Sequence, residues 1–157
     1  MATFKSLQGS TSQAVCILID DAITGSGNTD FSVNQPANTL VEEVYVRVVE
    51  APTITSGDIG LTMGYTQSGT EVVGNSTGVD NLLDGGTTLP ANTVFKMTGN
   101  ADTSFAAFAT GDAASETAHA AYKTDATTLF GRIATTTAAS AGGKLEVHVV
   151  FRYFHSI

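Results

Sequence analysis

The sequence predicts an all-β protein folded as an antiparallel, jelly-roll-like β-sandwich of about eight strands. Its clearest periodic segments alternate apolar and polar residues with a period of two, which is typical of half-buried strands. Glycine-rich turn signals separate these segments, and no series of helical patterns alternates with them. The chain of 157 residues is long enough to bury one core, so we expect 1–13 as an N-terminal arm and 14–157 as a single β-sandwich domain.

In chain order, strands are expected at 14–20, 40–49, 58–66, 69–74, 92–98, 128–136 and 144–154. The alternation is strictest in the second, the third and the last of these segments, and less regular in the others. In 40–49 the apolar face is expected to contain Leu40, Val44, Val46 and Val48, and the polar face Glu43, Tyr45 and Arg47.

Two connections are interpreted from their composition. Ala141-Gly142-Gly143 supplies residues that tolerate positive φ, so it is expected to join the last two strands as a hairpin or short loop. The segment 99–125 is rich in alanine and is expected to be an irregular excursion that ends in a strand. Asp112 also offers an N-cap for a short helix over 113–122, which is the alternative for this segment.

One short motif occurs twice. Pro36-Ala37-Asn38-Thr39-Leu40 recurs as Pro90-Ala91-Asn92-Thr93-Val94. In both copies proline fixes φ just before a strand begins, and asparagine can close a turn onto its own backbone. A two-lobed Greek-key sandwich would place equivalent turns at such a spacing, and a chance match of four residues is the alternative.

The charge balance excludes two classes of partner. The formal net charge is −8, with only 7 Lys plus Arg, whereas nucleic-acid binding requires a basic patch. An acidic membrane surface would repel the chain, and no apolar run approaches the ~20 residues of a membrane helix. We therefore expect neither a nucleic acid nor a membrane as a partner.

The residues with potential chemistry form no recognisable site in the sequence. Cys16 is the single cysteine and lies in an apolar run, so it is expected to be a small buried hydrophobe. The three histidines, His119, His148 and His155, lack metal-ligand spacing. We therefore expect no metal, no cofactor and no catalytic residues.

Two further motifs resemble functional patterns only in part. Gly74-Asn75-Ser76-Thr77-Gly78 matches the G-x-S-x-G nucleophile pattern, but no adequate helix follows it, so we interpret it as a turn. Asp80 and Asp84 are loop carboxylates that could hold calcium, although the residues around them lack the EF-hand ligand pattern. The chain is therefore not expected to be an enzyme.

Three runs of the sequence form a longer pattern: PANTLVEEVYVRVV from Pro36 to Val49, DIGLTMGY from Asp58 to Tyr65, and GGKLEVHVVFRY from Gly142 to Tyr153. Together they resemble small structural proteins of tailed bacteriophage particles. The resemblance covers most of 14–154 apart from about 99–120, and it consists of a strand pattern without an invariant motif.

The resemblance implies a capsid decoration (cement) protein with a jelly-roll-like fold. Such a protein is usually a homotrimer on the outer capsid surface of the virion, where it clamps neighbouring subunits of the major capsid protein. The expected partners are thus the major capsid protein and further copies of the chain, and no catalytic residue transfers. A receptor- or glycan-binding β-sandwich head of a phage fibre is the alternative, and a tail or connector structural component is another.

Two sets of residues are candidates for a protein interface. Phe4 and Leu7 are isolated apolar residues near the N-terminus, in a segment that could order on a capsid or be a frayed terminus. Glu43, Tyr45 and Arg47 point outward from their predicted strand, where they could contact a partner. Plain solvated strand surface is the alternative for these three residues.

Overall fold

The computed structural model describes residues 11–25, 27–55, 59–67, 69–73, 80–83, 89–97, 122–135 and 141–154. Within these ranges it contains nine strands and no helix. The strands are β1 (Ser12–Thr24), β2 (Asn28–Gln35), β3 (Thr39–Glu50), β4 (Ile59–Gly64), β5 (Asp80–Leu83), β6 (Val94–Met97), β7 (Tyr122–Lys123), β8 (Thr127–Thr135) and β9 (Ala141–Tyr153).

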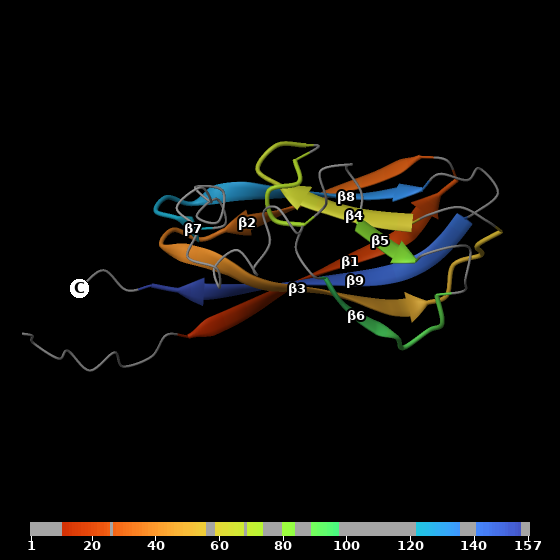
Figure 1. Cartoon of the computed structure of the whole chain (residues 1–157). Helices are drawn as coiled ribbons and strands as arrows, with labels where there is room; N and C mark the ends of the chain where they lie inside the picture. Colours follow the sequence, from red (N-terminus) through yellow and green to blue (C-terminus); the bar gives the residue numbers. More distant parts are fainter. Residues whose placement is uncertain are drawn as a thin grey trace, which may run out of the picture.

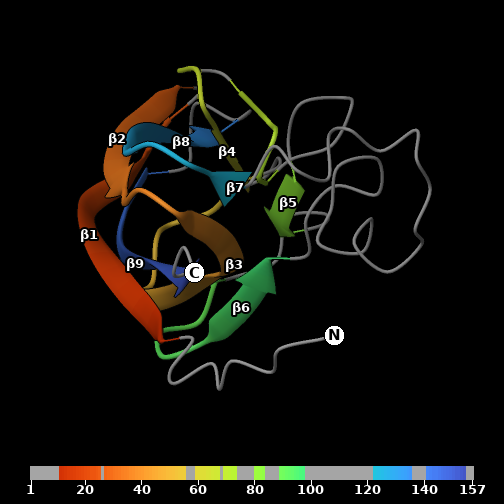
Figure 2. The same ribbon diagram turned by 90° about the vertical axis from the view of Figure 1, so that its left-hand side faces the viewer.

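The strands form two antiparallel sheets that face each other (Figures 1 and 2). One sheet has the order β1-β9-β3-β6, with the short β7 pairing with the start of β3, and the other has the order β2-β8-β4-β5. When β7 is set aside, one sheet contains the first, eighth, third and sixth strands and the other contains the second, seventh, fourth and fifth. This is the order of a jelly roll, so the predicted fold class is confirmed.

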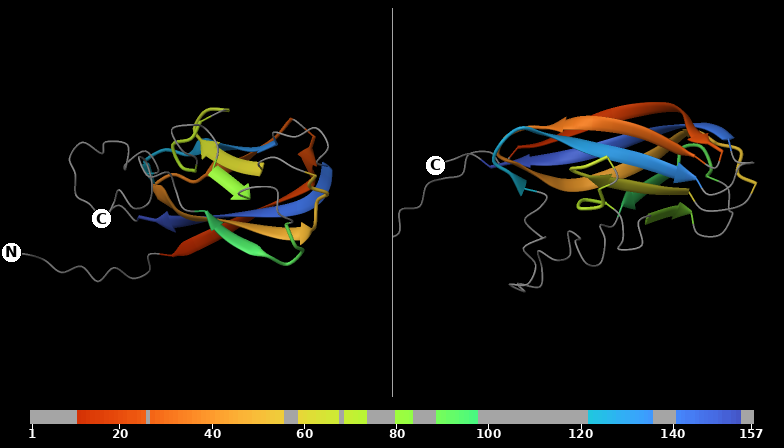
Figure 3. Two further views of the ribbon diagram at one scale, coloured as in Figure 1. Left: turned by 45° about the vertical axis from the view of Figure 1, so that its right-hand side comes forward. Right: turned by 90° about the horizontal axis from the view of Figure 1, so that it is seen from above.

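The core lies between the two sheets and is formed by alternate residues of the long strands and by β4, which is buried along its whole length. In Figure 3 the long strands β1, β9 and β3 run side by side along the sandwich. The buried hydrophobic residues of β3 and β9 are Val41, Val44, Val46, Val48, Leu145, Val147, Val149 and Phe151. Leu40 was expected to share the buried face, but it is only partly buried because a bulge between Val41 and Glu43 shifts the alternation.

The prediction missed β2 and β5 and placed one strand wrongly. The inward positions of β2 are Thr29, Phe31, Val33 and Gln35, so polar residues interrupt the apolar alternation that would have indicated a strand. The strand predicted over 69–74 is wrong for the part that the structure describes. There the backbone N–H groups of Val72 and Val73 both donate to the carbonyl of Met63, and Val73 makes only an isolated bridge to β4.

The predicted hairpin at Ala141-Gly142-Gly143 is also wrong. These residues begin β9, and β8 and β9 belong to different sheets. Gly142 and Gly143 have φ angles of 76° and 80° and lie opposite an irregularity in β1 between Asp20 and Ile23. A Cβ atom on Gly143 would lie 2.7 Å from Cβ of Pro52. The two glycines therefore accommodate a bulge inside a strand pair rather than a turn.

The repeated motif forms two turns of similar conformation. Asn38 and Asn92 have φ angles of 54° and 67°, in the left-handed region that asparagine tolerates. The amide of Asn38 donates to Thr124, and that of Asn92 donates to Val48. Each turn precedes a strand of the five-stranded sheet and follows a strand of the four-stranded sheet. The two copies are thus equivalent corners between the layers.

Several predictions fall on parts of the chain that the structure does not describe. They concern Phe4, Leu7, the G-x-S-x-G motif at 74–78, Asp84, His119, His155 and the helix alternative over 113–121. At the end of the alanine-rich segment, Tyr122 and Lys123 form β7.

Candidate binding face

The outer face of the five-stranded sheet is covered by polar side chains in regular rows. Antiparallel register places residues of neighbouring strands directly opposite one another, with their side chains on the same face. One row contains Cys16, His148, Tyr45 and Lys96 from β1, β9, β3 and β6, and we call it the histidine row. The next contains Leu18, Glu146, Arg47 and Val94 from the same four strands, and we call it the arginine row.

The three predicted interface residues of β3 lie on this outer face and are held by polar contacts. The Tyr45 hydroxyl donates to Glu43, and the Lys96 ammonium also contacts Glu43. Arg47 Nη1 lies 3.1 Å from Glu146 Oε2, and its Nη2 lies 3.4 Å from Asn92 Oδ1. The hydrogen bond from Lys96 keeps the pKa of the Glu43 carboxyl below its ordinary value. Glu43 and Tyr45 thus belong to a group that joins β3 to β6, and Arg47 belongs to a second group that joins β3 to β9.

Cys16 is exposed, so the prediction that it is buried is wrong. Alternation along β1 directs Ile19 into the core and leaves Cys16 and Leu18 on the outer face. An apolar run can therefore lie on a strand whose outer face is open to solvent. Partial desolvation of the thiol, followed by the negative charge of Glu146, raises the pKa of Cys16 above its ordinary value.

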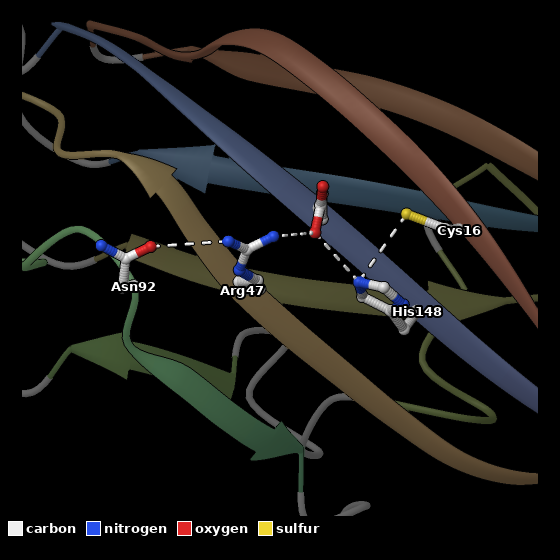
Figure 4. A network of polar contacts seen from close by, with 5 residues as sticks. Cys16, Arg47, Asn92 and His148 are labelled. Carbon is white, nitrogen blue, oxygen red and sulfur yellow. Dashed lines mark hydrogen bonds and ion pairs between the residues drawn. The ribbon is translucent and has the colours of Figure 1, made fainter.

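Cys16, His148 and Glu146 converge at the junction of the two rows (Figure 4). His148 Nε2 lies 3.7 Å from Cys16 Sγ and 3.2 Å from Glu146 Oε2. The hydrogen bonds of His148 and Arg47 lower the pKa of the Glu146 carboxyl. One donor atom from each of the three residues lies within 4.8 Å of the others. A sulfur, an imidazole nitrogen and a carboxylate oxygen are therefore brought together on two neighbouring strands.

No local pattern in the sequence indicates this cluster. Glu146 and His148 are two apart on β9, which indicates that they share a face, but Cys16 is separated from His148 by 132 positions. Only the β1–β9 register, in which Cys16 is opposite His148, brings the sulfur to the imidazole. Strand register over such a separation depends on the whole fold and cannot be read from spacing.

Two further ion-pair groups lie on the same sheet. Lys144 Nζ is 3.0 Å from Asp20 and 3.1 Å from Glu50, and so connects β1, β9 and β3. Arg152 contacts Glu42, which also accepts a hydrogen bond from Ser12 Oγ at 2.8 Å. Exposed pairs of this kind contribute little stability individually. They do fix the positions of charges along the sheet.

The outer face of the four-stranded sheet has a shallow depression between β2 and the turn after β4. The depression is lined by Asp30, Phe31, Ser32, Gln67 and Phe130. Arg132 Nε lies 2.7 Å from Asp30, and Gln67 Nε2 donates to the same carboxylate at 3.1 Å. In the part of the chain that the structure describes, this depression does not bring together several kinds of donor atom, as Cys16, Glu146 and His148 do on the five-stranded sheet, so it is the weaker candidate site.

Comparison with known proteins identifies no family. No family model matches the chain, and no curated protein matches it. Among solved structures, the chain is similar to one in the cyanophage Pam1 capsid asymmetric unit, with a TM-score of 0.49 and 15% sequence identity. The similarity covers 98% of this chain and 93% of that one. A likeness at this level does not establish a shared function. Within the described residues, no helix is long and apolar enough to cross a membrane.

Acid is expected to destabilise the fold through paired carboxylates, namely Glu146, described above, and three others. Hydrogen bonds from Arg132, Arg152 and Lys96 lower the pKa values of Asp30, Glu42 and Glu43, respectively, below their ordinary values of 3.8 for Asp and 4.5 for Glu. The folded chain therefore binds fewer protons than the unfolded chain near these pH values. The resulting stabilisation is present at neutral pH and is lost as the pH falls through about 4 and below.

The melting temperature, followed by circular dichroism, should therefore decrease between about pH 6 and about pH 3. Glu42→Gln removes one of the paired carboxylates, so this variant should melt lower at neutral pH and show a smaller decrease on acidification. A wild-type melting temperature that is constant or rises over this range would contradict the prediction.

Proposed function

We propose that this chain is a structural protein of a tailed-phage virion that binds the major capsid protein at the outer surface of the head. In this proposal it also associates with copies of itself as a trimer and has no catalytic role. The resemblance of its strand pattern to small phage structural proteins supports the proposal. The jelly-roll order of its strands is consistent with it, because this architecture recurs in viral capsid proteins.

The observation that carries the proposal is the arrangement of the arginine row. Leu18 and Val94 are large hydrophobic residues with exposed fractions of 54% and 58%, and both lie in this row on the two edge strands β1 and β6. Between them lies the Arg47–Glu146 ion pair. The row is thus apolar at its two ends and charged in the middle. Apolar anchors that can be desolvated, together with charges that set register, are what a protein-binding face requires.

The first test is the copy number in purified particles of the phage that encodes the chain. Quantitative mass spectrometry should find on the order of hundreds of copies per particle, as expected for a protein that follows the symmetry of the shell. Copies on the order of tens, together with binding to a glycan array, would instead support a fibre head. Absence of the chain from purified particles would overturn the proposal.

The second test locates the binding face. A Leu18→Ser/Val94→Ser double variant should bind shells of the major capsid protein about tenfold more weakly or worse, because it removes both apolar ends of the arginine row. The matched control is Phe154→Ser, which changes a large hydrophobic residue that is 45% exposed and lies outside this row. Equal binding by the double variant and the wild type in a shell co-sedimentation assay would exclude this face. Light scattering of the isolated chain measures its mass in solution, which should be that of a trimer.

A further inference from the structure

We propose that Cys16, Glu146 and His148 bind a divalent cation of borderline softness, with Zn²⁺ as the best fit, on the outer face of the five-stranded sheet. The proposal is independent of the capsid role, because it concerns only side chains of one copy of the chain. Three protein donors leave one coordination position open for water or for a group from another molecule.

Two of the three donor separations are close to those expected around one tetrahedral ion. With bonds from zinc of about 2.3 Å to sulfur and about 2.0–2.2 Å to nitrogen and oxygen, tetrahedral angles place pairs of donors about 3.3–3.6 Å apart. The Sγ–Nε2 and Nε2–Oε2 separations are 3.7 Å and 3.2 Å. These two pairs of donors therefore need to move by only a few tenths of an ångström to bind one ion, and the third pair, Sγ and Oε2, lies within 4.8 Å, a range that side-chain rotation can close.

Without an ion, neither neutral tautomer of His148 lets Nε2 make a strong hydrogen bond to both of its neighbours. Its Nε2 faces both Cys16 Sγ and Glu146 Oε2. If Nε2 carries the proton, it donates to Glu146 but cannot accept from the Cys16 thiol. If Nδ1 carries the proton, Nε2 can accept from the thiol, but its lone pair then faces the carboxylate oxygen. A cation that displaces the thiol proton would satisfy all three lone pairs at once.

The donors are held on rigid elements and are open to solvent. Glu146 and His148 alternate on the central strand β9, and Cys16 is directly opposite His148 on β1. Cys16 is exposed, so an ion can reach the cluster without opening of the fold. The donor types favour Zn²⁺ over Ca²⁺ or Mg²⁺, since hard cations prefer a full set of oxygen ligands whereas thiolate and imidazole suit zinc.

Arg47 opposes binding and provides a diagnostic variant. Its guanidinium lies 3.1 Å from the Glu146 oxygen that faces His148. This positive charge competes with the cation for the carboxylate and repels it. Arg47→Gln should therefore increase the affinity for the ion several-fold. If the three side chains form only a hydrogen-bond network, the substitution removes an ion pair and the affinity for the ion does not increase.

The experiment titrates the purified full-length chain with Co²⁺, followed by absorbance, and with Zn²⁺, followed by calorimetry. The wild type should bind one equivalent, with the visible bands of tetrahedral Co²⁺ and a thiolate-to-cobalt charge-transfer band. Cys16→Ser should abolish the charge-transfer band, and both it and His148→Gln should weaken Zn²⁺ binding about tenfold or more. Lys96→Gln, in the histidine row but outside the cluster, should bind as the wild type does.

Circular dichroism of each variant establishes that it is folded before titration. No saturable uptake by the wild type at Zn²⁺ concentrations up to about 100 μM, which corresponds to a binding free energy weaker than about −5.5 kcal/mol, would overturn the proposal. So would uptake that survives in Cys16→Ser and is lost on replacement of His119 or His155. Neither result bears on capsid binding, which is measured with shells.

Discussion

Phe151→Ala is expected to lower the free energy of unfolding by about 3–5 kcal/mol. Phe151 is fully buried and belongs to the set of largest buried side chains in the described core. It lies on β9, the strand between β1 and β3, where it is opposite Gln13 on one side and Val41 on the other. Paired strands on both sides limit how far the backbone can relax into the cavity. Since domains are stable by only about 5–15 kcal/mol, this loss would remove a large part of the total.

The measurement is urea denaturation followed by circular dichroism, which suits an all-β domain if unfolding is two-state. The matched control is Phe154→Ala, three positions further along the chain. Phe154 is 45% exposed and makes an edge-to-face contact with Tyr122, with ring centroids 5.6 Å apart. Its replacement should cost only about 1 kcal/mol. Similar losses of unfolding free energy for the two variants would show that the buried Phe151 contributes no more to stability than the exposed Phe154 does.

The sequence predicts those strands that have one buried face and one exposed face. Buried residues alternate strictly from Val44 to Val48 of β3 and from Leu145 to Phe151 of β9, so both the strands and the outward direction of Glu43, Tyr45 and Arg47 follow from a period of two. The strand β2 was missed because its inward positions include Thr29 and Gln35, which do not look like core residues. Gln35 can be buried in the core only because tertiary contacts supply its hydrogen bonds.

The candidate sites depend on how neighbouring strands are paired, which the residue pattern of a single strand does not show. Which charge faces Arg47 is set by the register of β3 with β9, and the pairing with Glu146 spans 99 positions. Cys16 was assigned to the core because the apolar run around it suggested burial on both faces. Its strand instead has one face toward the core and the other, with Cys16 and Leu18, on the outside of the sandwich. Glycines at 142 and 143 were interpreted as a turn because positive φ is commonest there, whereas the fold uses them at a bulge.

Gln35→Met is expected to lower the free energy of unfolding by about 2–4 kcal/mol, because it keeps the side-chain volume but removes two buried hydrogen bonds. Gln35 is fully buried at the end of β2. Its Nε2 donates to the carbonyl of Thr39 at 3.0 Å, and its Oε1 accepts from the Tyr65 hydroxyl at 2.9 Å. Thr39 begins β3 in the opposite sheet and is itself fully buried. The side chain thus joins the two layers at the corner formed by the first copy of the repeated motif.

Tyr65→Phe separates the two hydrogen bonds of Gln35. It removes the hydroxyl donor but leaves the bond to the Thr39 carbonyl intact, so it should cost only about 1 kcal/mol. The double variant should then be less destabilised than the sum of the two single variants, because the Tyr65–Gln35 bond is lost in each of them. Urea denaturation of the four proteins gives this coupling energy. A Gln35→Met variant within about 0.5 kcal/mol of the wild type would mean that the Thr39 carbonyl finds another donor once the amide is gone. The corner would then be held by apolar packing rather than by the buried glutamine.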